Sequence, residues 1–153
     1  MIDIEIEDER WSQTVPDAEA LTRRAAEAAL AGERGHNITV LLTDDATVRE
    51  LNGRFRGKDA ATNVLSFPAF DNPEGFLGDI ALAFGICERE AAEQGKSLAH
   101  HLQHLVAHGA LHLVGYDHQS DADAEAMEAL EREILSGLGV PDPYAATGQG
   151  DHG

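Results

Sequence analysis

Three histidines lie within eleven residues of this chain, in segment 108–118. Their spacing is His-x-x-x-His-x-x-Gly-x-x-His, in which Gly115 is the glycine. On a helix, His108 and His112 would lie one turn apart on the same face. Gly115 would then end the helix and direct His118 back towards the pair. Three imidazoles with an open fourth position are typical of a catalytic zinc site, so the segment predicts a metal centre.

The residue that follows the first histidine argues against ordinary peptidase chemistry. Zinc peptidases with this spacing place a Glu there as general base, whereas this chain has Gly109. A base would have to come from elsewhere, and Asp79, Asp117 and a metal-bound hydroxide are candidates.

Three more histidines, His100, His101 and His104, precede the motif. We interpret His100 and His101 as residues of a polar helix face or as core histidines satisfied by hydrogen bonds. For His104, the same structural interpretation stays open beside two others: a hydrogen-bond partner of a metal ligand, or an outer ligand. The sequence around His108 and His112 is apolar, so their rings are expected to point into the protein, where unsatisfied imidazoles are costly.

The identity and role of the metal follow from the ligand types. One Zn²⁺ per chain is the first choice for an all-imidazole site, although nickel, copper or another divalent transition metal would also be accepted. A purely structural zinc would need a fourth protein ligand, for which only Cys87 and Asp117 are plausible. We interpret Cys87 as a small buried residue, so a catalytic site with three histidine ligands is expected.

Composition bounds the remaining possibilities. The 153 residues carry 28 acidic and 11 basic side chains, a net charge of −17, which argues against a protein that coats nucleic acid. Four of the cations, however, lie in one ten-residue stretch: Arg49, Arg54, Arg56 and Lys58. The single cysteine fits a reducing compartment. No apolar run is long enough to span a membrane and the acidic N-terminus is no signal peptide, so a cytoplasmic protein is expected.

Periodicity and turn residues predict the elements that must position these groups. We expect strands near residues 2–6, 36–42, 63–67 and 78–84, and helices near residues 17–31, 44–53, 86–95, 97–113 and 120–137. This order predicts one α+β domain over residues 1–140, with a small mixed sheet of about four strands covered by helices. The histidine-bearing helix should be central, with the third and fourth strands antiparallel. Residues 141–153 are predicted to be a disordered tail.

Several blocks together resemble one known family. Segment 108–118, with its Gly-Tyr-Asp-His ending, is similar to the signature of the YbeY family of bacterial metal-dependent endoribonucleases. Segments 51–68 and 77–80 agree with it, as does the acidic stretch 125–131. The resemblance covers residues 36–138 in order.

The resemblance implies a function and a set of site residues. It implies that His108, His112 and His118 bind zinc, and that Arg56 occupies the position of an arginine involved in RNA processing. It implies cleavage of single-stranded RNA, usually at the 3′ end of small-subunit rRNA, and hence a role in rRNA maturation and ribosome quality control. Implied partners are the ribosomal small subunit, a basic ribosomal protein and an assembly GTPase; neither a membrane nor DNA is expected.

Two other functions stay open at this point. One is a metallohydrolase of a non-RNA substrate such as an amide, against which the absent Glu and the basic stretch weigh. The other is a non-catalytic ribosome-assembly factor with a structural zinc, which the net charge of −17 favours.

Overall fold

A computed structural model describes residues 2–30, 37–69, 75–115 and 120–142. The elements within these ranges are β1 (Ile2–Ile6), α1 (Arg10–Thr14), α2 (Ala18–Ala29), β2 (Asn37–Thr43), α3 (Asp45–Arg56), β3 (Val64–Pro68), β4 (Phe76–Ala83), α4 (Phe84–Gln94), α5 (Leu98–Leu113) and α6 (Asp121–Gly137).

The four strands form one mixed sheet in the order β1-β2-β4-β3. β1 and β4 both pair parallel with β2, and β3 pairs antiparallel with β4 along the edge. The predicted α+β class, strand number and antiparallel pairing are therefore confirmed. The alternation that predicted β1 is visible in burial, since Ile2, Ile4 and Ile6 are less exposed than the acidic residues between them.

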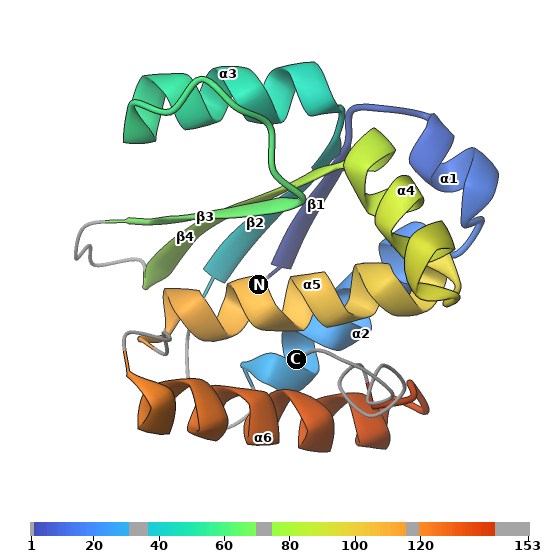
Figure 1. The fold of residues 1–153 in the computed structure, drawn as a ribbon, viewed down its shortest axis with the longest axis vertical. Coiled ribbons are helices and arrows are strands. Elements are labelled where there is room, and N and C mark those ends of the chain that lie inside the picture. The colour runs from blue at the N-terminus through green and yellow to red at the C-terminus, as the bar shows by residue number, and fades with distance from the viewer. Residues whose placement is uncertain (1, 31–36, 70–74, 116–119, 143–153) are drawn as a thin grey trace.

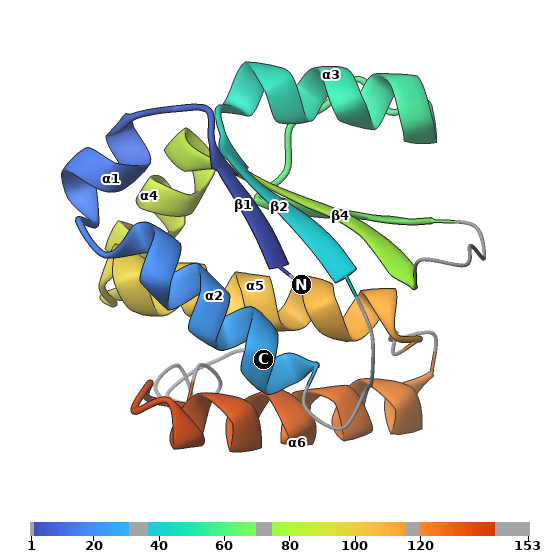
Figure 2. The ribbon, with the colours of Figure 1, turned by 180° about the vertical axis from the view of Figure 1, so that it is seen from behind.

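Helices cover the two faces of the sheet unequally. Figure 1 shows α3 alone on one face, α5 on the other, and α6 beyond α5, away from the sheet; Figure 2 shows α2 beside α5 on the same face. The larger apolar core lies on the α5 side and includes Leu102 and Val106, while Val48 and Ala81 belong to a smaller cluster below α3. The histidine-bearing helix is thus central, as predicted.

Polar N-caps fix the starts of the helices that matter for the site. The Ser97 side chain accepts a hydrogen bond from the His100 amide at the start of α5, and Ser120 does the same for Asp123 in α6. Asp44 caps α3 by accepting from the Thr47 amide at 2.7 Å. Such caps satisfy amides that have no partner within the helix, and they confirm the predicted beginnings of α5 and α6.

The structure differs from the prediction in one element and in several element boundaries. The short helix α1 was not predicted. Trp11 holds it in place, because its indole N–H donates to the Thr43 carbonyl at 2.9 Å and its ring meets Phe84 edge-on at 5.2 Å. Phe84 begins α4 instead of ending β4. α3 continues to Arg56, past Gly53, because the chain turns left-handed only at Gly57, where φ is 70°.

Some predicted features lie outside the described residues. They are the start of the second strand at residue 36, most of the turn at 71–75, and the tail from residue 143. In the part of the chain that is described, no helix is both long and apolar enough to cross a membrane.

Candidate functional site

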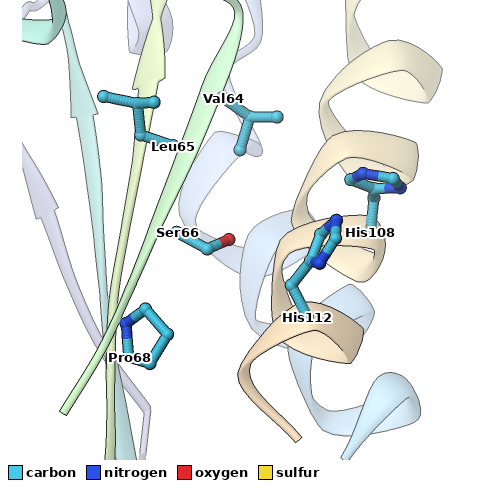
Figure 3. Close-up of a pocket in the computed structure, with 6 residues that line it drawn as sticks. All are labelled: Val64, Leu65, Ser66, Pro68, His108 and His112. Carbon is cyan, nitrogen blue, oxygen red and sulfur yellow. The ribbon is translucent and has the colours of Figure 1, made fainter. Parts of the chain in front are cut away.

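His108 and His112 lie together on α5 and face a cavity. Their rings are 4.7 Å apart between centroids and nearly perpendicular. The cavity has a volume of about 250 Å³ and is lined by the two histidines and by Val64, Leu65, Ser66 and Pro68 of β3. Figure 3 shows both rings projecting from α5, with the Ser66 hydroxyl on the side of the strand that faces the helix. The predicted pairing of these histidines on one helix face is confirmed.

Close packing at Gly109 sets the distance between α5 and the sheet. A Cβ at this position would lie 3.0 Å from Cγ2 of Ile80 and 3.1 Å from Oγ of Ser66. The Ser66 hydroxyl donates to the Gly109 carbonyl at 3.2 Å. A glutamate at this position would press its Cβ against Ile80 and Ser66. The helix-to-sheet contact therefore explains why the peptidase glutamate is absent here.

A buried glutamate on α6 is hydrogen-bonded to two of the histidines of α5. The Glu131 side chain has an exposed fraction of 0%. One of its oxygens lies 2.6 Å from Nδ1 of His108, and the other lies 2.9 Å from Nε2 of His104. Sequence reasoning assigned no role to Glu131. The available signal was its position on the apolar stripe of α6, four residues from both Met127 and Leu135.

The donor atoms of His104, His108 and Glu131 lie within 4.8 Å of one another, so this group could hold a metal ion. Its contacts at 2.6 and 2.9 Å are, however, hydrogen bonds. Ligands of a tetrahedral zinc with bonds of about 2.0–2.1 Å are roughly 3.3 Å apart, so a metal here would have to break both bonds. By contrast, when Nδ1 of His108 bonds to Glu131, Nε2 of the same ring can still bind a metal. His112 beside it supplies a second imidazole. The histidines that line the cavity therefore fit a divalent metal.

The other residues that the sequence predicted for the site are either not described or lie away from the cavity. His118 and Asp117 lie outside the described residues, and Arg56 ends α3 with a side chain that is not described. Asp79 is removed as a candidate base. It pairs with Phe67, whose ring contacts Phe55 of α3, so it lies on the face of the sheet opposite His108. Burial, and secondarily the charge of Glu5, raises the pKa of the Asp79 carboxyl.

His100, His101 and Cys87 lie away from the cavity that His108 and His112 line. His101 is buried and its Nε2 lies 2.9 Å from Oε1 of Glu90; burial lowers the pKa of its ring despite this partner. His100 lines a separate cavity with Gln94 and Lys96. Cys87 is fully buried, and burial raises the pKa of its thiol. The interpretation of Cys87 as a core residue is confirmed.

Of the basic stretch, Arg49 and Arg54 are exposed on α3, and Lys58 is exposed in the loop that follows it. Arg49 pairs with Asp59 at 2.7 Å, so one of the four cations is neutralised locally. Phe55 is 62% exposed, and the guanidinium of Arg54 lies 5.5 Å from its ring centroid. An exposed aromatic ring among cations is the usual composition of a surface that stacks nucleic-acid bases.

Fold and site together define a class of protein. A mixed sheet packed closely against a helix that presents paired histidines to a cavity has the features of a hydrolase site. The family model described as "Endoribonuclease YbeY" matches residues 3–139, so the chain belongs to this family. Membership confirms the resemblance and the prediction that the chain is an enzyme.

Individual relatives agree over nearly the whole length. A protein from Rhodopseudomonas palustris (strain BisB18), named Endoribonuclease YbeY, is 55% identical over 145 residues, covering 87% of this chain and 86% of its own. One of the same name from Azorhizobium caulinodans is 49% identical, covering 97% and 99%. The solution structure of TM1509 from Thermotoga maritima superposes with a TM-score of 0.60 at 28% identity, covering 90% of this chain and 91% of that one.

Proposed function

We propose that this chain is a zinc-dependent endoribonuclease that cleaves single-stranded RNA. Its metal ligands are His108, His112 and His118, and Arg56 binds a substrate phosphate. The observation that carries the proposal is the pair of imidazoles on the cavity beside β3, with ring centroids 4.7 Å apart, in a chain of the endoribonuclease YbeY family.

The chain's own residues have distinct tasks in this reaction. His108 and His112 hold the metal on the cavity side of α5, and β3 forms the opposite wall. When bound, a divalent metal supplies Lewis acidity, which activates a nucleophile and withdraws charge from phosphoryl oxygens. Arg56 contributes a permanent positive charge with paired N–H donors that suits a phosphodiester. Asp79 lies on the opposite face of the sheet from His108, so Asp117 is the remaining carboxylate that would accept the nucleophile's proton, whether the nucleophile is water or the 2′-hydroxyl of RNA. A bound metal would supply an alternative base by lowering the pKa of its water.

The surface near β3 supports a single-stranded substrate. Phe67 on the α3 face of the strand contacts the exposed ring of Phe55 at 5.5 Å, whereas the neighbouring Ser66 and Pro68 line the histidine cavity. β3 is an edge strand. An RNA strand that crosses this edge would therefore reach the Phe55 ring on one side and the histidines on the other. Unpaired bases can stack on such a ring, whereas bases within a duplex cannot.

The packing argues against a purely structural metal. The larger apolar core runs continuously through α2, α4, α5 and α6, with Leu102, Val106 and Met127 fully buried. These helices are thus held together without a metal. A structural zinc is normally closed off by its ligands, whereas His108 and His112 line a cavity.

The cellular role is inferred from the family and the charge. We assign the enzyme to maturation of the 3′ end of small-subunit rRNA and to ribosome quality control in the cytoplasm. Its net charge of −17 would weaken its binding of free RNA and would complement a basic ribosomal protein. Such a partner on the small subunit would bring the substrate to the cavity.

The test compares His112→Ala with a control on the same helix, His100→Ala, in nuclease-free, zinc-loaded protein. Single-stranded and duplex RNA oligonucleotides serve as substrates, and circular dichroism monitors folding. We expect wild type and His100→Ala to cleave only the single strand, and His112→Ala to stay folded without cleaving. A 2′,3′-cyclic phosphate product would identify the 2′-hydroxyl as nucleophile. Cleavage that persists in His112→Ala, or its absence in zinc-loaded wild type, would contradict the proposal.

A further inference from the structure

Glu131 lies on α6, and its carboxylate contacts two histidines of α5. It is the only fully buried carboxylate among the described residues. A buried carboxylate is costly unless partners satisfy it. Here each oxygen has one imidazole partner: Oε2 lies 2.6 Å from Nδ1 of His108, and Oε1 lies 2.9 Å from Nε2 of His104.

The charge of Glu131 decides which ring nitrogen of His108 carries hydrogen. An ionised carboxylate only accepts hydrogen bonds, so with Glu131 ionised Nδ1 of His108 is the donor. A neutral imidazole protonated at Nδ1 has its lone pair on Nε2. His108 also lines the cavity, beside His112. The hydrogen bond therefore leaves Nε2 of His108 as the only ring atom of that residue with a lone pair for a metal.

We propose that Glu131 is a positioning residue for the metal site: it holds His108 in the Nδ1–H tautomer so that Nε2 binds the metal, and His104 anchors the second carboxylate oxygen. This inference rests on the proposed role of His108 as a ligand. It also assigns His104 to the support of the site, in place of direct metal binding. The carboxylate reaches the metal only through the His108 ring and does not touch the substrate.

Two substitutions separate the hydrogen bond from the charge. Glu131→Gln keeps the shape of the side chain, and in one orientation its oxygen accepts from His108 while its amide donates to Nε2 of His104. Glu131→Met keeps a similar volume but removes the acceptor. Glu133→Met, at an exposed position of the same helix, is the matched control.

The primary measurement is the Kd for Zn²⁺ by competition with a chelator, in protein shown to be folded. Loss of an outer-shell partner typically weakens metal binding about 10–100-fold. We expect that loss in Glu131→Met, a smaller one in Glu131→Gln, and none in Glu133→Met. Zinc binding by folded Glu131→Met within about twofold of wild type would overturn the proposal.

A second measurement needs no variant. Nitrogen-15 NMR of the metal-free wild type, at a pH where the ring is neutral, reports the His108 tautomer. The proposal requires hydrogen on Nδ1; hydrogen on Nε2 overturns it, even if Glu131→Met does not fold. Wild type that binds no zinc would defeat the proposed function as well. Zinc binding that is lost in His112→Ala but unchanged in Glu131→Met defeats the role of Glu131 alone.

Discussion

Replacing Gly109 by alanine tests whether close packing of α5 against the sheet positions the histidines. The added Cβ would lie 3.0 and 3.2 Å from two Ile80 methyl carbons and 3.1 Å from the Ser66 hydroxyl. Favourable contacts between carbon atoms begin at about 3.5 Å. The helix or the strand would have to move by several tenths of an ångström, on the side that carries the cavity.

The size of the effect follows from two opposing contributions. Overpacking a core typically costs about 1–3 kcal/mol, whereas alanine in a helix interior is about 1 kcal/mol better than glycine. We therefore expect Gly109→Ala to lower the free energy of unfolding by about 0–2 kcal/mol. Gly53→Ala in α3 is the control, because its Cβ would meet only the Lys58 carbonyl, at 3.7 Å. It should gain up to about 1 kcal/mol.

The assay is urea unfolding of the two variants and wild type, followed by circular dichroism. The two variants should differ by about 1–3 kcal/mol, which for a domain of this size corresponds to roughly 2–12 °C in Tm. If Gly109→Ala proved as stabilising as Gly53→Ala, the reasoning on close packing, and with it the explanation for the absent glutamate, would be refuted.

Three more predictions address the charge, the surface and the core. Because the pKa of Asp79 is raised from its ordinary value of 3.8, the folded protein binds this proton more tightly than the unfolded chain does. Stability should therefore fall as pH rises from that value through the raised pKa. Asp79→Asn should flatten this fall and raise the free energy of unfolding at neutral pH; an unchanged urea profile at acid and neutral pH would count against it. Phe55→Ala should weaken binding of a single-stranded oligonucleotide by the energy of one stacked base, about 1–3 kcal/mol, in a fluorescence anisotropy titration; an unchanged Kd would remove Phe55 from the RNA surface. The Cys87 thiol, buried and with a raised pKa, should react with a thiol reagent only as fast as the protein unfolds, and rapid labelling of the native protein would be inconsistent with its burial.

Much of the fold could be predicted because the local sequence pattern of these elements matches the way they are buried and capped in the folded protein. The alternation of Ile2, Ile4 and Ile6 with acidic residues predicted β1. Ser97 and Ser120 marked the starts of α5 and α6. The four-residue spacing of His108 and His112 predicted their shared face, since a helix brings such residues together whatever packs around it.

The features that sequence reasoning missed depend on contacts between distant segments. Helix α1 has only five residues, and tertiary contacts of Trp11 with Thr43 and Phe84 hold it in place. Asp79 was a candidate base because its type suited the role, but strand register decides which face it occupies. The contact of Glu131 with His108 joins two helices over 23 residues of sequence, and no spacing rule connects them.

Zinc-edge anomalous diffraction from crystals of the zinc-loaded protein tests the central claim most directly. We predict one strong peak per chain about 2.0–2.1 Å from Nε2 of His108 and from Nε2 of His112, with His118 as the third ligand and Glu131 still bonded to Nδ1 of His108. A peak between His104, Glu131 and Nδ1 of His108 would contradict it, because the metal would then occupy the buried cluster instead of the cavity.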